Sequence, residues 1–110
     1  MKLLLDEDLD VKLRFRFGNA HEVSTVRQMD WLGKNNGELL RLMLATGFEA
    51  LITGDQNIPY QHDWTTLPLA VIVLTGHPKK YATHLTLMPQ VLVLLEQPKL
   101  AGGVHIVSAA

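Results

Sequence analysis

Short apolar runs alternate with longer amphipathic segments along the chain, and the two patterns predict different elements. The run from Leu3 to Leu5 stops at Asp6, which is typical of a short strand covered on both faces of a parallel sheet. Leu69 to Leu74 is the most strand-like run in the sequence. Strands are predicted on this basis at residues 3–5, 21–26, 50–53, 69–74 and 104–107.

Apolar residues recur at helical spacing in three other segments, which predicts helices over 8–17, 38–45 and 81–96. Asp8 is suited to cap the first helix, and Asn35 or Asn36 the second. Pro89 lies inside the third pattern. Because proline lacks an amide hydrogen, we expect it to break that helix or to open a second piece of it.

The alternation of strands and helices predicts a single three-layer α/β/α domain that spans residues 1–110. Strand–helix–strand connections favour a mostly parallel sheet of about five strands. The chain has 47% hydrophobic and 19% charged residues, a composition typical of an ordinary globular domain. No repeat, linker or low-complexity segment interrupts it.

Composition and charge narrow the classes of function. The absence of cysteine excludes disulfides, thiol nucleophiles and thiolate zinc sites, and we expect a cytoplasmic protein. The apolar run at the start is too short for a secretory signal or a membrane span, so no membrane partner is expected. A net charge of −1 offers no bulk attraction for nucleic acid, which would need a local basic patch or metal ions.

Acidic residues follow two of the predicted strands. Asp6 closes the first and Asp55 comes directly after the third, and in a parallel sheet ligands gather beyond such carboxyl ends. Carboxylates brought close together repel each other unless a cation lies between them, and hard divalent ions prefer oxygen ligands. The sequence therefore predicts a Mg²⁺ or Mn²⁺ site at Asp6 and Asp55, with Asp8 and Glu38 as further oxygen donors.

Each of these residues also has a purely structural interpretation. Asp8 and Asn36 are good helix caps, and Glu38 suits the start of a helix electrostatically. Asp55 and Asn57 together are typical of a stabilised turn.

Four segments in order resemble the small uncharacterised PIN-like proteins: LLLDEDL, HEVSTV, GELLRLMLATG and LITGDQNIPYQ. The resemblance implies a compact nuclease-type fold, related to the toxin ribonucleases of bacterial toxin–antitoxin pairs, in which clustered acids bind Mg²⁺ or Mn²⁺ and cleave RNA. It matches Asp6 to the family's first acid and Asp55, following Thr53, to the acid of the threonine-x-aspartate turn. It also implies self-association and pairing with an antitoxin protein.

The sequence departs from the family pattern at two acidic positions, where Asn36 and Asn57 replace aspartates. A two-metal site needs enough negative charge to hold ions about 3.5 to 4 Å apart, so this loss reduces the expected site to one metal or none. If the site is active, phosphate contacts are expected from Lys34, Arg27, Lys79 and Lys80, and the amides of Asn36 and Asn57 are further candidates for substrate binding.

Two other functions remain open. A PIN-like module that binds RNA or protein without catalysis fits the asparagines at positions 36 and 57. A phospho-acceptor receiver-like signalling domain would also place acids after its first and third strands. However, it needs a helix between the third and fourth strands, and residues 56–68 contain two prolines there.

Overall fold

The computed structural model of the chain describes residues 1–57, 69–97 and 102–108. Within these residues, strands form one sheet in the order β2-β1-β3-β4-β5, and every neighbouring pair is parallel. The predicted α/β fold with a parallel sheet is confirmed, and each predicted strand matches within one residue at either end. The strands are β1 (Lys2–Leu5), β2 (Glu22–Thr25), β3 (Ala50–Thr53), β4 (Ala70–Leu74) and β5 (Gly103–Val107).

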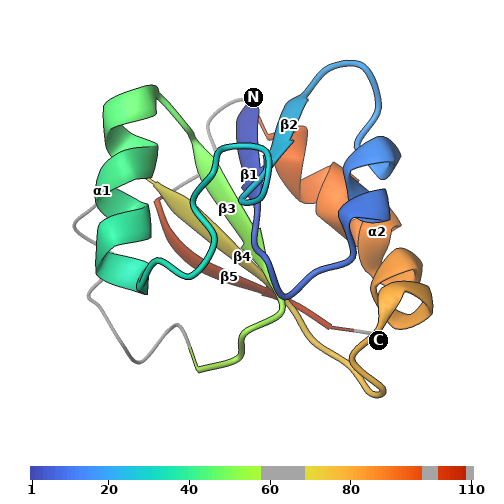
Figure 1. Cartoon of the computed structure of the whole chain (residues 1–110). Helices are drawn as coiled ribbons and strands as arrows, with labels where there is room; N and C mark the ends of the chain where they lie inside the picture. The colour runs from blue at the N-terminus through green and yellow to red at the C-terminus, as the bar shows by residue number, and fades with distance from the viewer. Residues whose placement is uncertain (58–68, 98–101, 109–110) are drawn as a thin grey trace.

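Helices cover both faces of the sheet (Figure 1). The α-helix α1 (Asn36–Thr46) lies on one face, while the 3₁₀ helix η1 (Val11–Arg16) and the α-helix α2 (Tyr81–Leu95) lie on the other. Because successive side chains of a strand point to opposite faces of the sheet, they pack into two separate cores. Leu3 and Leu5 pack in the core beneath η1 and α2, whereas Leu4 packs in the core beneath α1. This double coverage explains why all residues of β3 and β4 are buried.

The first helix differs from its prediction, which was an ordinary helix over 8–17 capped by Asp8. Only Val11–Arg16 is helical, and Asp10 caps it by accepting a hydrogen bond from the Lys12 amide at 2.9 Å. The prediction that Asp8 caps this helix is wrong, because the Asp8 carboxylate makes other contacts. The apolar spacing still predicted the buried side, since Leu13 is fully buried.

The third predicted helix is continuous, so the break expected at Pro89 is wrong. Pro89 lies inside α2 and is exposed to solvent. Apolar spacing in the sequence predicts a buried stripe through residues 85, 88, 92 and 95 of this helix, but 85 and 92 are only half-buried. The fully packed side chains of this helix are those of His84, Leu87, Met88, Val91 and Leu95.

The strand order places a topological switch point between β1 and β3. From β1 the chain moves to β2 on one side of the sheet, and it then crosses to β3 on the other side of β1. Helices that connect strands in opposite directions leave a crevice at the carboxyl ends of the two strands where the direction changes. Asp6 follows β1 and Asp55 follows β3, so both predicted acids lie at this point.

Candidate functional site

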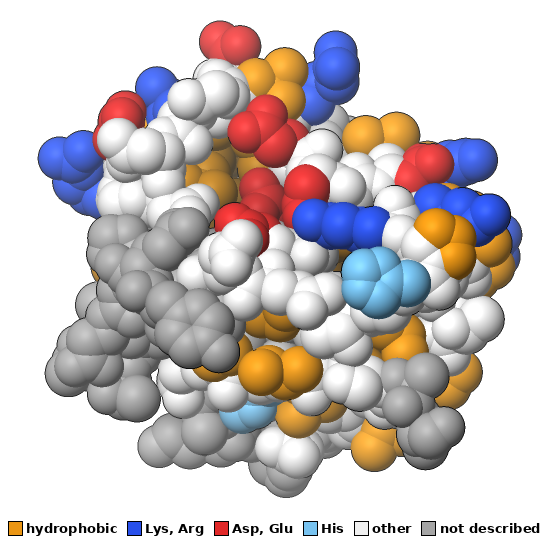
Figure 2. Space-filling model, turned by 90° about the horizontal axis from the view of Figure 1, so that it is seen from below, with side chains coloured by type: hydrophobic (Ala, Val, Ile, Leu, Met, Phe, Trp, Pro, Cys, Tyr) orange, Lys and Arg blue, Asp and Glu red, His pale blue; other side chains and the backbone are white. Residues whose placement is uncertain are grey.

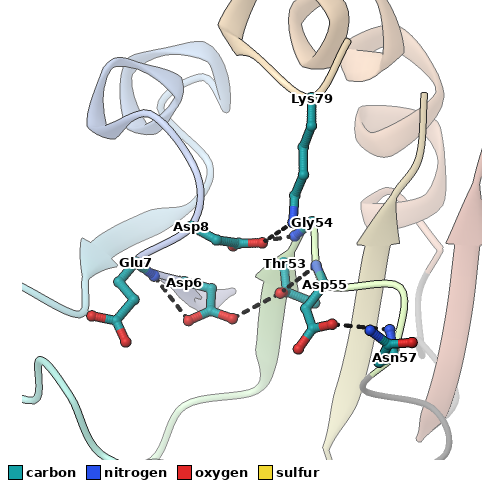
Figure 3. Close-up of polar contacts among 8 residues, drawn as sticks. All are labelled: Asp6, Glu7, Asp8, Thr53, Gly54, Asp55, Asn57 and Lys79. Carbon is teal, nitrogen blue, oxygen red and sulfur yellow. Dashed lines mark hydrogen bonds and ion pairs between the residues drawn. The ribbon is translucent and has the colours of Figure 1, made fainter. Parts of the chain in front are cut away.

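Asp6 and Asp55 are connected through the hydroxyl group of Thr53 (Figure 3). The Asp6 amide donates to the Ile52 carbonyl at 2.9 Å, which continues the pairing of β1 with β3 beyond the strand end. Thr53 Oγ1 donates to Asp6 Oδ2 at 2.7 Å and accepts from the Asp55 amide at 3.1 Å. The structure thus brings together the two acids on which the predicted site depends.

Sequence reasoning named Thr53 only as the residue that precedes the Asp55 turn, and it missed the role of this side chain in the site. Thr53 is fully buried at the end of β3, where an apolar residue would otherwise be expected. A buried hydroxyl needs a hydrogen-bond partner, and Asp6 supplies it. The available signal was a threonine placed two residues before an aspartate, directly after an apolar strand.

Asp8 lies beside this pair and is already engaged by two other groups. Its Oδ1 accepts from the Gly54 amide at 3.3 Å, and its Oδ2 forms an ion pair with Lys79 Nζ at 3.0 Å. A Cβ atom at Gly54 would lie 2.8 Å from Lys79 Cε and 3.1 Å from Asp8 Oδ2. Glycine at position 54 therefore permits the close approach of these side chains to the end of β3.

Acidic side chains gather in the middle of the carboxyl-end face, with a basic side chain beside them (Figure 2). Glu7 lies between Asp6 and Asp8 in the segment that follows β1. Its amide donates to Asp6 Oδ1 at 2.8 Å, and its own Oε2 accepts from the Gly33 amide at 3.4 Å. The loop after β2 is thereby held against the loop after β1.

Burial raises the pKa of Asp6 above its usual 3.8, and the neighbouring charges of Asp8 and Glu7 raise it further. The hydrogen bonds from the Thr53 hydroxyl and the Glu7 amide lower the pKa, but the net shift is upward and burial is its largest cause. An ionised Asp6 in this position is therefore an unfavourable charge, which a bound cation would stabilise.

Glu38 does not share a hydrogen bond with these acids. Its amide donates to Asn35 Oδ1 at 2.8 Å, and its own Oε1 accepts from Asn35 Nδ2 at 2.8 Å. These reciprocal bonds cap α1 at its start. The alternative prediction of Asn36 as the cap is wrong, since Asn36 is the first residue of the helix itself.

The remaining predicted residues do not join the acids in one cluster. Lys34 and Lys80 are exposed, and Lys80 precedes α2. Asn57 donates its amide to Asp55 Oδ1 at 2.9 Å, which is the turn considered as the structural interpretation of this pair. Among the described residues, no group of three or more histidine, cysteine, aspartate or glutamate side chains is arranged to hold a metal ion.

His84 is a second polar residue that the sequence did not single out. Its side chain is only 2% exposed, and neither ring nitrogen has a hydrogen-bond partner in the described part of the chain. Burial lowers its pKa below 6.5, while the Asp8 charge raises the pKa and the Lys79 charge lowers it. His84 therefore lies in the field of the Asp8–Lys79 pair as a neutral imidazole.

Comparisons with protein-family models, with curated protein sequences and with solved structures found no match. The PIN-like resemblance of the sequence therefore remains a prediction. In the described ranges, no helix has both the length and the apolar character needed to span a membrane. The receiver-like alternative depends on residues 56–68, of which 58–68 lie outside the described residues.

Proposed function

We propose that this protein is a metal-dependent ribonuclease of the PIN-like type, with Asp6 and Asp55 at its active site. The observation that carries the proposal is the bridge through Thr53, whose hydroxyl joins the Asp6 carboxylate to the backbone amide of Asp55 at the switch point of the sheet. A role as the toxin of a toxin–antitoxin pair is part of the proposal and comes from the resemblance of the sequence.

The donor set at this site fits a single divalent ion such as Mg²⁺ or Mn²⁺. Mg²⁺ is usually bound through one or two carboxylates and keeps several waters. Each oxygen of Asp6 accepts one hydrogen bond, which leaves a second lone pair on each, and Asp55 uses only Oδ1 in the contacts with Asn57. The raised pKa of Asp6 supports the same conclusion, because a cation would relieve the cost of its charge.

The residues around the ion have separate tasks in this mechanism. When bound, Mg²⁺ or Mn²⁺ supplies positive charge that favours deprotonation of an attacking water and offsets charge on the leaving oxygen of a phosphodiester. Thr53 fixes the orientation of Asp6 through its hydroxyl, and the Asn57 amide fixes Asp55. Lys79 neutralises Asp8, so the site presents fewer free charges than a two-metal centre requires.

The proposal is tested by incubating the purified protein with a single-stranded RNA oligonucleotide and Mn²⁺. Asp6→Asn and Asp55→Asn should each reduce the cleavage rate by roughly 100-fold, because a ligand of the ion is lost. Glu22→Gln is the matched control, since this exposed carboxylate lies at the amino end of β2, on the opposite edge of the sheet. Cleavage that persists unchanged in Asp6→Asn would contradict the proposal.

A binding module without catalysis is the second candidate function. It is favoured by the engagement of Asp8 with Lys79 and of Glu38 with Asn35, because these contacts leave two acids for metal binding. Such a module would bind the oligonucleotide without degrading it in Mn²⁺. A receiver-like domain would do neither, and would instead gain the mass of a phosphoryl group at Asp55 from a phosphoryl donor.

A further inference from the structure

A second hollow lies outside the acidic site, between η1 and the segment that follows β2. Its volume is about 260 Å³, and its lining is mostly apolar with two guanidinium groups. The lining residues are Val11, Arg14, Phe15, Thr25, Arg27 and Gln28. Of these side chains, only Arg27 was a candidate in the sequence analysis, as a phosphate contact.

Phe15 is the most exposed of the large hydrophobic residues in the described part of the chain, at 71%. Val11 on the same helix is 49% exposed, whereas Leu13 between them is fully buried. A phenylalanine ring turned toward solvent adds little to the core of its own protein, and exposed aromatic side chains at a hollow are typical of a binding surface.

One arginine side chain lies over this exposed ring, and a second lines the same hollow. The Arg14 guanidinium lies 4.6 Å from the centre of the Phe15 ring. Neither Arg14 nor Arg27 forms an ion pair with any carboxylate of the described residues. Lys12 is within 3.7 Å of Asp10, and Arg16 donates to the Tyr81 hydroxyl, so the neighbouring cations of η1 are engaged. Arg14 and Arg27 are therefore available to an anionic ligand.

The hollow includes the carboxyl end of β2, which lies on the same edge of the sheet as the acidic site. Thr25 pairs with Leu5 in the register of β2 and β1, and the Val26 amide donates to the Leu5 carbonyl at 3.1 Å. Arg27 therefore follows the strand that neighbours β1, which Asp6 follows. Neighbouring strands are about 4.8 Å apart. A chain molecule held in the hollow would reach Asp6 within a short span.

We propose that this hollow binds a single-stranded polynucleotide, with a base stacked on Phe15 and phosphates paired with Arg14 and Arg27. The proposal rests on the ribonuclease function proposed above and assigns the residues that hold its substrate. An alternation of ring and guanidinium matches the alternation of base and phosphate, and stacking on an aromatic side chain requires a base that is free of a duplex. Arg14 and Arg27 form no ion pair among the described residues and give the hollow positive charge, so the observations favour an anionic polynucleotide over a folded protein.

Binding is measured by fluorescence anisotropy of a labelled oligouridylate in EDTA, where a metal-dependent nuclease does not cleave. Phe15→Ala should raise the dissociation constant at least about five-fold, since stacking of one base is lost. Arg14→Gln and Arg27→Gln should each weaken binding and reduce the slope of log K against log salt by about 0.7. Exposed residues elsewhere provide the controls Val93→Ala and Arg41→Gln, which should bind as the unaltered protein does.

Further measurements test whether the hollow binds a single-stranded polynucleotide rather than a duplex or a second copy of the protein. An oligodeoxyuridylate of equal length should bind to a similar extent, because ring and guanidinium contacts do not involve the 2′-hydroxyl. A duplex that binds as tightly as the single strand would overturn the proposal, and so would unchanged binding in Phe15→Ala. A dimer in sedimentation that Phe15→Ala converts to a monomer, without RNA binding, would assign the surface to self-association and also overturn it.

The two proposals fail in distinguishable ways. If Asp6→Asn abolishes cleavage but the Phe15 and arginine variants bind and cleave normally, the ribonuclease stands and the polynucleotide hollow does not. If those variants lose binding while no metal-dependent cleavage occurs in any form of the protein, the hollow stands and the nuclease does not. Each protein is checked for folding by circular dichroism, and Phe15 is exposed enough for its truncation to leave the core intact.

Discussion

Lys79 and Asp8 form an ion pair across the carboxyl edge of the sheet, with Nζ and Oδ2 3.0 Å apart. Lys79 lies between β4 and α2, whereas Asp8 follows β1, so the pair connects loops of two strands that are separated by β3. The Lys79 charge already neutralises Asp8, and the Gly54 amide binds the other oxygen of this carboxylate. Asp6 and Asp55 are therefore the acids best placed to bind a cation.

Replacing Lys79 should strengthen metal binding. Lys79→Met keeps the length of the side chain but removes a positive charge and releases Asp8, so the affinity for Mn²⁺ should rise roughly three-fold. The effect is small because the lysine side chain is 44% exposed and therefore screened by water. Titration with Mn²⁺ followed by electron paramagnetic resonance measures it, with Lys80→Met as the control. Weaker binding in Lys79→Met would mean that the ion pair itself assembles the site.

The charge of Asp6 should make the metal-free protein less stable as pH rises. Burial raises the pKa of Asp6 above 3.8, so the folded protein holds this proton more tightly than the unfolded chain does. The resulting stability is present in full below about pH 3.8 and is lost as pH rises through the raised pKa. Asp6→Asn removes this dependence, and its asparagine can still accept from Thr53.

Urea unfolding in EDTA between about pH 3 and pH 7 checks the Asp6 prediction. As pH increases, the free energy of unfolding of Asp6→Asn should rise relative to that of the unaltered protein. Glu22→Gln controls for the loss of an exposed carboxylate. Parallel pH profiles of Asp6→Asn and the unaltered protein would show that this carboxyl ionises equally easily in the folded and unfolded states.

His84 should produce the opposite dependence on pH. Burial lowers its pKa below 6.5, so its contribution to stability is complete above about pH 6.5 and is lost as pH falls through the lowered pKa. His84→Leu should remove that loss. It should also stabilise the protein by about 1 kcal/mol near neutral pH, because two buried nitrogens without partners are replaced by an apolar side chain.

Thermal unfolding at about pH 8 and about pH 5.5 distinguishes the two contributions of His84. The melting temperature of His84→Leu should exceed that of the unaltered protein at both pH values, with the larger difference at the lower one. His77→Gln is the control, because His77 is exposed on the segment before α2. A destabilised His84→Leu at both pH values would indicate that the imidazole is needed for packing.

Strand positions could be predicted from the sequence because burial on both faces leaves uninterrupted apolar runs. Ala50–Thr53 is an example, with all of its residues buried. The type and the ends of the helices were harder to predict from the sequence. The four-residue apolar spacing around Leu13 favours an α-helix, whereas the structure forms a 3₁₀ helix, as the backbone bond from the Leu13 amide to the Asp10 carbonyl shows.

The candidate site could be predicted only in part, for a related reason. Asp6 and Asp55 each follow the end of a strand, and the ends of neighbouring parallel strands lie close together. An apolar run followed by an acidic residue was therefore enough to predict that these two residues meet. The contacts of Asp8 with Lys79, and the position of His84 near both, depend on how the loop before α2 folds back over β3. No spacing in the sequence encodes that approach.

Glu38 provides a test of where the metal site ends. Its side chain accepts from Asn35 Nδ2 at 2.8 Å, and a glutamine would keep an oxygen for this bond. Glu38→Gln should therefore change the free energy of unfolding by less than about 0.5 kcal/mol and leave Mn²⁺ affinity unchanged if the glutamate only caps α1. Asn35→Ala should cost about 1 kcal/mol, since the Glu38 amide loses its partner. A loss of Mn²⁺ affinity in Glu38→Gln without a loss of stability would instead make Glu38 a third ligand, as the sequence first predicted.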